Sequence, residues 1–459
     1  MPESGFVRLG CAKADITPQH PLPLAGFAHR SGNYERIDKP LYARILFFAP
    51  GENRQALIVS ADLLSWGDEI TDKLKSALGK RWGLTNNQIV LHATHSHSGP
   101  QTAGGYTELL GEPDSGYVAL LQQRILEAVE RAAAAPEHVY PERGSGRCEL
   151  GVYRRKRADG LIRMAPNPDV PIDHDVSVVR YAAADGRAKA VLVHYACHPT
   201  VSGDNTLSPE YPGVAMEAVE QSLGGEAVSV FLQGACADVR PALVRDGEFY
   251  RGGYAEVEAI GRKLADEVVA ILAKPMTRLA PGSLAARSAL VPLRLQEPPS
   301  REQAAKWAYP IEGDAGVPNS PQPAPPGAAV QGGAVKQLAP DANVLKAWSR
   351  HLIDRDKLSM DSVELKLGYV ELAEGFALLC ANAEMSGEYG AYLKSRFAGR
   401  VLPVCYCDGM LGYVCTAEQL AEGGYEAVDY IYYFGLPAPL APEAEEAIRT
   451  AMEELVHGR

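Results

Sequence analysis

Over the first 290 residues, short apolar segments typical of strands alternate with longer amphipathic segments typical of helices. This alternation indicates an α/β fold, because helices that follow strands along the chain can cover the sheet. We therefore predict mixed β-sheets flanked by helices. The expected strands are residues 43–49, 55–59, 88–91, 176–181, 188–195, 227–232, 363–369 and 376–380, and the expected helices are 68–81, 117–135, 212–223 and 254–273.

The composition changes between residues 296 and 343, where Pro, Gly, Ala and Gln dominate. Such a stretch is typical of a flexible linker or of a loop over a site. We interpret it as an insertion, acting as a lid or an interface loop, within a single domain that spans residues 1–459. A chain of this size can bury a large core without disulfides.

The charge and the cysteines limit the class of partner. The net charge is -12, which argues against nucleic-acid binding. The sequence has neither a signal-peptide pattern nor an apolar run long enough to span a bilayer, so we expect a cytoplasmic protein without an integral membrane segment. In that reducing compartment the eight cysteines are expected to be free thiols. The expected partner is a small-molecule substrate, and a homo-oligomer is left open.

The first motif that suggests chemistry is the segment ATHSHSGP at residues 93–100, directly after an expected strand. In extended backbone, residues two apart point to the same side, so His95 and His97 would face one point beyond the strand end. Ligands of α/β folds bind at such strand ends, and two imidazoles suit a metal ion. The alternative is a pair of surface or capping histidines in a turn.

Two further strand ends carry polar residues. The strand at 188–195 includes His194, interpreted as a structural histidine, and His198 follows in the loop, where a third metal ligand would be useful. The strand at 227–232 runs into Gly234 and Asp238, where backbone N–H groups can stabilise an oxyanion. Asp238 and Asp62 are candidates for orienting groups around the site.

An ordered set of motifs along most of the chain resembles the catalytic domain of the neutral (non-lysosomal) ceramidases. No single motif is specific, but their order is. The motifs are ADITP (14–18), AGFA (25–28), LYAR (41–44), VSAD (59–62), THSHSGP (94–100), RR (154–155), NP (167–168), DHD (173–175), AE (383–384), GYVCT (412–416) and GYEA (424–427).

The resemblance implies a ceramidase-like catalytic domain with one catalytic zinc ion. By position, the residues that match the family's zinc ligands are His95, His198, Glu384 and Tyr413. Without the resemblance, Glu384 would be interpreted as a helix-start carboxylate and Tyr413 as a half-buried strand residue. The implied site is an open catalytic one, not a closed cysteine-rich structural one.

Three departures from the family pattern favour a small soluble substrate over ceramide. Gly234 stands where the family has a serine after the glutamine of the strand-end turn, so a mechanism that needs this hydroxyl is excluded. The chain ends soon after the motif at Tyr425, so we expect no C-terminal immunoglobulin-like domain. A secretion signal is also not found.

The resulting hypothesis is a zinc-dependent hydrolase, amidase-like on an N-acyl bond, that uses zinc-activated water. His97 is the candidate proton shuttle, with a hydrogen-bonded supporting histidine as the alternative. Arg155 or Arg154 would bind a substrate carboxylate, unless they are surface arginines. The alternative functions are hydrolysis of an ester, lactone or glycosidic bond, and a non-catalytic metal-binding or ligand-binding protein.

Overall fold

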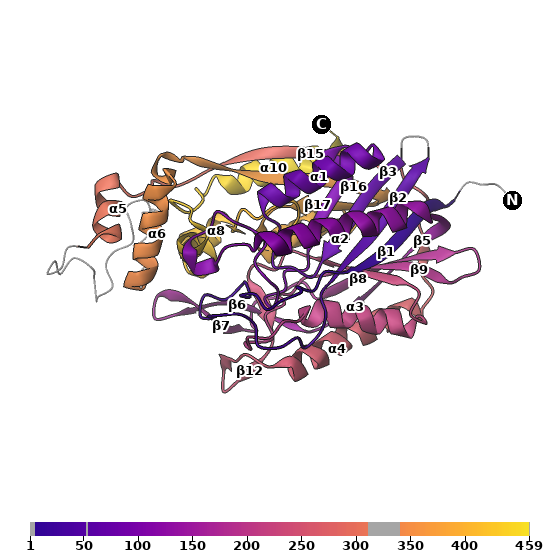
Figure 1. The fold of residues 1–459 in the computed structure, drawn as a ribbon, viewed down its shortest axis with the longest axis horizontal. Helices are drawn as coiled ribbons and strands as arrows, with labels where there is room; N and C mark the ends of the chain where they lie inside the picture. The colour runs from indigo at the N-terminus through magenta and orange to yellow at the C-terminus, as the bar shows by residue number, and fades with distance from the viewer. Residues whose placement is uncertain (1–4, 52–53, 311–339, 459) are drawn as a thin grey trace.

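The computed structural model describes residues 5–51, 54–310 and 340–458. Two β-sheets pack face to face, and helices cover the outer face of each (Figure 1). The predicted α/β class with mixed sheets and flanking helices is confirmed. None of the helices in these ranges is long and apolar enough to cross a bilayer.

The larger sheet has nine strands, mostly antiparallel with a parallel pair at each end. Its path runs β10 (Val228–Gln233), β9 (Ala188–Tyr195), β8 (Asp175–Ala183), β5 (Glu137–Arg147), β1 (Val7–Asp15), β2 (Tyr42–Gly51), β3 (Arg54–Ala61) and β4 (Ile89–Ala93), with β14 (Thr277–Arg278) beside β5. Its outer face is covered by α1 (Asp68–Trp82), α2 (Ser115–Ala134), α3 (Glu210–Ser222) and α4 (Tyr254–Leu272).

The smaller sheet has four strands and its own helical cover. The strands are β15 (Ala286–Arg294), β16 (Ser362–Ala373), β17 (Phe376–Ala381) and β19 (Val401–Val404), and the covering helices are α7 (Gly387–Arg396) and α10 (Ala444–His457). Three short sheets complete the fold: β6 (Gly151–Ala158), β7 (Leu161–Asn167) and β11 (Val239–Pro241); β12 (Val244–Arg245) and β13 (Glu248–Phe249); and β18 (Glu384–Met385) and β20 (Tyr413–Val414).

Strand β2 of the large sheet is buried on both faces, and its side chains alternate between two cores. On β2, Ile45 and Phe47 pack into the core under the helices, whereas Leu46 and Phe48 pack into the core between the two sheets. This is the period of two that a strand imposes. A strand buried on both faces is a continuous apolar run, which is why this segment was predictable from the sequence.

The two ends of the large sheet, β10 and β4, are brought together, although six strands separate them along its path. Buried His92 on β4 makes the connection. Its Nε2 accepts a hydrogen bond from the backbone N–H of Gln233 on β10, at 2.9 Å. Its Nδ1 therefore carries the proton and faces the Ser60 hydroxyl at 2.9 Å, which in turn donates to the carbonyl of Phe231 at 2.7 Å.

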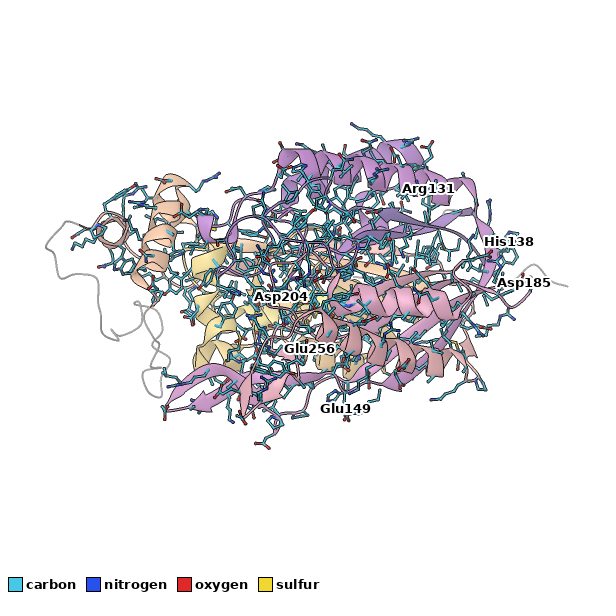
Figure 2. All side chains as sticks on the ribbon, turned by 60° about the horizontal axis from the view of Figure 1, so that its bottom comes forward. Arg131, His138, Glu149, Asp185, Asp204 and Glu256 are labelled. Atoms are coloured by element: carbon cyan, nitrogen blue, oxygen red, sulfur yellow. The ribbon has the colours of Figure 1, made fainter. Side chains whose placement is uncertain are left out.

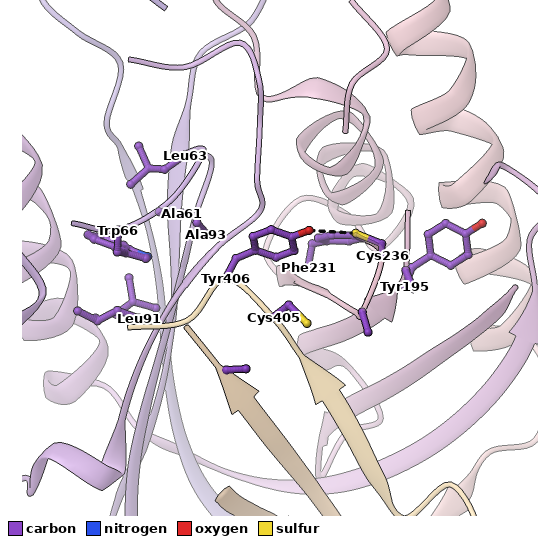
Figure 3. Packing of buried hydrophobic residues seen from close by; sticks show 14 of the residues in the cluster. Ala61, Leu63, Trp66, Leu91, Ala93, Tyr195, Phe231, Cys236, Cys405 and Tyr406 are labelled. Carbon is purple, nitrogen blue, oxygen red and sulfur yellow. Dashed lines mark hydrogen bonds between the residues drawn. The ribbon is translucent and has the colours of Figure 1, made fainter. Parts of the chain in front are cut away.

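A segment that continues from β19 fills the space between these two ends. The N–H of Cys405 donates to the carbonyl of Gln233 on β10, and the carbonyl of Tyr406 accepts from the N–H of Ala93 on β4. The Tyr406 ring lies between the two strands, and its hydroxyl contacts the Cys236 thiol at 3.3 Å (Figure 3). The two sheets are thus joined where β4 and β10 end.

Part of the proline-rich region at 296–343 forms a helix. Helix α5 (Arg301–Ala308) begins within it, capped by the Ser300 side chain, which accepts from the N–H of Gln303. Its Trp307 ring lies 6.1 Å from that of Trp348 on α6 (Ala342–Asp354). The expectation of a linker or loop is therefore wrong for residues 301–308, and residues 311–339 lie outside the described residues.

The cysteine prediction is confirmed, since all eight cysteines are free and seven are buried. Several segments not singled out in the sequence also form regular structure, including β1, β5, the hairpin of β6 and β7, and α10. Two short helices, α8 (Ala417–Glu422) and α9 (Ile431–Phe434), follow β20.

We predict that His92→Leu lowers the free energy of unfolding by about 2 to 5 kcal/mol, because the Gln233 N–H and the Ser60 hydroxyl lose a partner, at about 1 to 3 kcal/mol per buried group. Chemical denaturation measures the change. The control is His138→Ala, at an exposed position on β5 near the edge of the molecule (Figure 2), where little change is expected. Equal stabilities would show that the His92 connection contributes nothing.

The same variant has a defined pH dependence. Burial, with smaller effects of His194 and His95, lowers the pKa of His92 from 6.5 to about 3. Between these values the unfolded chain binds the proton that the folded chain excludes, so this group destabilises the fold as pH falls below about 6.5. The stability difference between wild type and His92→Leu should therefore shrink on acidification, and a constant difference from pH 8 to pH 5 would contradict this.

Candidate metal centre

Three histidines from opposite ends of the large sheet meet at one point. His95 and His97 follow β4, His198 follows β9, and the three offer nitrogen atoms that all lie within 4.8 Å of one another. All three side chains are buried, and His97 is the most exposed at 9%. This group could bind a metal ion.

His95 and His97 face one point as predicted, but not because the backbone that carries them is extended. The backbone after β4 is not extended, and His95 has a φ of 66°, in the left-handed region that residues other than glycine rarely adopt. The ring of His95 stacks on that of Tyr406, with 4.0 Å between centroids. Strained backbone of this kind is concentrated at functional sites, where packing holds it in place.

The tautomer of each histidine is fixed by the backbone. Each Nδ1 faces carbonyl oxygens, which only accept hydrogen bonds, so Nδ1 carries the proton and Nε2 of the neutral ring has a free lone pair. The partners are Leu64 for His95, Gly26 for His97, and Cys236 and Val239 for His198, at 2.6 to 3.0 Å. Histidines that bind metals are typically held in this way.

The Nε2 atoms face one another and a carboxylate. His95 Nε2 lies 3.2 Å from His97 Nε2, and Glu384 Oε2 lies 3.3 Å from His95 Nε2 and 3.0 Å from His198 Nε2. Without a cation between them, these lone pairs would repel. Two donor atoms bound to one tetrahedral zinc ion at about 2.0 Å would be about 3.3 Å apart, and Glu384 Oε2 lies at about this distance from Nε2 of His95 and of His198, so these residues fit such an ion.

Protonation of the rings is the alternative way to satisfy this arrangement, and burial disfavours it. Burial, followed by the charge of Arg154, lowers the pKa of His198 to about 4. Burial also lowers the pKa of His97 well below its usual value. Glu384 is buried too, which favours its neutral form, but His95 and His198 outweigh burial and hold its pKa well below the usual range.

Glu384 and Tyr413 come from a small sheet of two strands, each two residues long. They are direct partners in the two-residue parallel pair of β18 and β20, so their side chains leave the same part of the backbone. The Tyr413 hydroxyl accepts a hydrogen bond from Arg154 Nη2 at 3.2 Å. Burial and, after it, the Glu384 carboxylate raise the pKa of Tyr413 well above its ordinary value, so the isolated phenol is protonated.

One carboxylate holds both arginines of the RR motif. Glu426 accepts from Arg154 Nε at 2.6 Å and from Arg155 Nη1 at 2.9 Å. Neighbouring residues of a strand normally point to opposite faces, but the register of β6 shifts between Tyr153 and Arg155. The second guanidinium nitrogen of Arg155 donates to Glu422 and to backbone carbonyls, so Arg155 is bound within the protein and does not face a substrate.

The other polar residues suggested by the sequence also have structural partners. Asp238 accepts from the N–H of Gly387 at the start of α7 and from the side chain of Gln419 on α8. The N–H of Gly234 donates to the carbonyl of Tyr195 and is therefore not directed at a substrate. A side chain at Gly234 would meet His194 within about 3.0 Å, so this position faces the core.

Two residues that sequence reasoning singled out lie in the core. Asp62 lies directly after β3. It accepts hydrogen bonds from the guanidinium of Arg44 and from the N–H of Tyr42 at the start of β2. His194 on β9 faces the carbonyl of Pro403 at 2.6 Å, as expected of a structural histidine. Glu426 and Tyr406 were not proposed as contributors, and only the GYEA motif at 424–427 gave a signal for the former.

More than half of the chain matches a known protein family. The family model described as neutral/alkaline non-lysosomal ceramidase, N-terminal, matches residues 7–249, which is more than half of the chain. The chain belongs to this family. The matched region contains His95, His97 and His198, whereas Glu384 and Tyr413 lie outside it.

Among curated proteins, this family member is similar to the neutral ceramidase of Pseudomonas aeruginosa. The two are 25% identical over 256 residues, which cover 51% of this chain and 37% of the relative. The chain therefore matches less than two fifths of that relative's length.

The fold is similar to that of solved ceramidases. The crystal structure of neutral ceramidase from Pseudomonas aeruginosa superposes with a TM-score of 0.71 at 18% identity, covering 99% of this chain and 74% of that one. A structure titled ceramidase complexed with C2 gives the same score and identity, covering 99% and 76%. The expected ceramidase-like fold is thus confirmed.

We predict that Glu426→Gln lowers the free energy of unfolding by about 3 to 5 kcal/mol, because two buried guanidinium groups lose their shared counter-charge. The control is Glu422→Gln, whose side chain is 26% exposed and which should cost much less. Urea denaturation compares the two variants with wild type, and similar losses would contradict a central role for Glu426.

Proposed function

We propose that this ceramidase-family chain is a zinc-dependent hydrolase that cleaves an N-acyl amide bond with an activated water molecule. The observation that carries the proposal is the convergence of proton-free Nε2 atoms and the Glu384 carboxylate on one buried point. Membership of the family supports amide hydrolysis as the reaction class. We further propose that residues 1–459 form a single catalytic unit.

In the proposed site, His95, His198, Glu384 and Tyr413 hold the zinc ion. When bound, zinc would polarise the acyl carbonyl and lower the pKa of a coordinated water toward neutrality. Arg154 donates a hydrogen bond to the hydroxyl of Tyr413, which is the partner of Glu384 across the β18–β20 pair. Backbone carbonyls keep the ligand histidines in the tautomer that leaves Nε2 free.

His97 is the proposed proton shuttle. Its Nδ1 is fixed by the Gly26 carbonyl, so Nε2 is the atom that takes a proton from the attacking water. The water oxygen forms a bond to the acyl carbon, the C–N bond breaks, and His97 returns the proton to the departing nitrogen. The products are a carboxylic acid and an amine.

Elemental mass spectrometry tests the metal site. We expect about one zinc per chain in wild type and loss of that zinc in His198→Ala, with the exposed His138→Ala as the matched control. A wild type that neither contains zinc nor takes it up after chelation would refute the proposed site. Zinc retained by His198→Ala would refute the ligand assignment.

A second prediction separates a proton shuttle from a ligand. His97→Ala should keep one zinc per chain while kcat for an N-acyl amide falls about 100-fold to 10,000-fold, because general-base catalysis contributes that much. Loss of zinc from this variant would make His97 a ligand. Turnover of matched esters but not of amides would replace amidase activity with esterase activity.

A further inference from the structure

Arg240 is a buried cation directly beside the backbone that positions a histidine of the metal centre. It lies on β11, and the carbonyl of the preceding Val239 accepts from Nδ1 of His198. Arg240 is only 6% exposed. Its guanidinium lies over the ring of Phe249, 4.3 Å from the centroid, so aromatic packing holds it in place.

Arg240 lacks the counter-ion that the neighbouring buried arginines have. Arg44 pairs with Asp62, and Arg154 and Arg155 share Glu426. Within the described ranges, no carboxylate lies within ion-pair distance of Arg240, and its Nε and Nη2 atoms have no hydrogen-bond partner. A buried charge without a partner is costly, so its retention calls for a ligand.

The charges nearest to Arg240 are also positive. Burial, followed by the charges of Arg251 and Arg154, lowers the pKa of Arg240 to about 10. Arg240 pairs with Val152 across β11 and β6, two residues before Arg154, whose charge acts on it. Arg154 in turn contacts Tyr413, which connects this cation to the metal centre.

The same positive region reaches the metal centre from a second side. The guanidinium of Arg251 lies over Phe27, 3.8 Å from its centroid, and the Phe27 ring lies 4.8 Å from that of His97. Arg30 donates to the backbone carbonyl of His97. The Glu210 carboxylate raises the pKa of Arg30 and of Arg251, so it offsets part of the positive charge at these two residues.

We propose that Arg240 binds a carboxylate of the substrate, so that the preferred substrates of the site are N-acyl compounds with an anionic group beyond the scissile amide, such as N-acyl amino acids. This rests on the proposed hydrolase function. The free Nε and Nη2 atoms form one edge of the guanidinium, which is the edge that binds both oxygens of a carboxylate side by side. The ligand supplies the counter-charge that the fold omits.

Three matched compounds test the proposal: N-octanoylglycine, the neutral N-octanoylglycinamide, and the phosphate monoester of N-octanoylethanolamine. Calorimetry gives the Kd on zinc-loaded protein, and amine release gives kcat/KM. We expect the glycine compound to bind at least about tenfold more tightly than the glycinamide. That preference should disappear in Arg240→Met and persist in Arg245→Met, a control at an exposed arginine on β12.

The outcomes separate this proposal from the hydrolase function. Turnover of all three compounds without a carboxylate preference would overturn the role of Arg240 and leave the hydrolase intact. Carboxylate preference without turnover would support the anion site and overturn the hydrolase. A preference that survives in Arg240→Met would assign the carboxylate to the metal and overturn the proposal, and tighter binding of the phosphate compound would replace the carboxylate by a phosphate.

Thermal unfolding distinguishes a ligand-binding role from a structural one. Because Arg240 is unpaired, Arg240→Met should melt no lower than wild type. A clear fall in its melting temperature would show that the guanidinium stabilises the fold through Phe249, against the proposal. Arg240→Lys keeps the charge but cannot form the two-point contact, so it should keep the melting temperature and lose most of the carboxylate preference.

Discussion

The metal centre depends on the connection between the two ends of the nine-stranded sheet. His95 follows β4 at one end of its path and His198 follows β9, the second strand from the other end, so the site exists only because the sheet curves until β4 and β10 meet. Buried His92 and the segment at residues 405–407 hold this junction with backbone hydrogen bonds. The polar groups that would otherwise be exposed at two sheet edges satisfy one another instead.

Around this junction, most of the buried polar and charged groups discussed above have a partner within the protein. Carbonyl oxygens accept hydrogen bonds from Nδ1 of the three imidazoles, and a single carboxylate, Glu426, neutralises two guanidinium groups. Two groups depart from this balance. The Nε2 atoms with Glu384 form an acceptor-rich point that needs a cation, and Arg240 is a cation that needs an anion. The acceptor-rich point and the unpaired Arg240 guanidinium lie in one region, as expected of a site that is completed by bound ligands.

The sequence predicted the parts of this arrangement that follow from local pattern. Buried strands followed by His95 and His198 could be recognised because apolar runs and loop histidines are adjacent in the chain. Glu384 and Tyr413 lie in strands of two residues, which are too short for any periodicity, and only the family resemblance pointed to them. The environment of Arg155 depends on a register shift and on Glu426, 271 residues away, which no local pattern contains. The left-handed backbone at His95 was likewise invisible, since it is imposed by tertiary packing.

The two-residue pairing of Glu384 with Tyr413 has a consequence for the order of assembly. The histidines come from the first half of the chain, whereas the acid and the phenol are added by a segment near its end. The contact of His198 with Glu384 joins residues 186 positions apart in the chain. Contacts of such large sequence separation form late in folding, because the entropy cost of closing the intervening loop must be overcome first. During synthesis the emerging chain would carry three imidazoles without their acidic partner, so tight metal capture has to wait until β18 and β20 have left the ribosome and paired. In the proposed site, occupancy by the metal would therefore report that β18 and β20 have joined the three histidines.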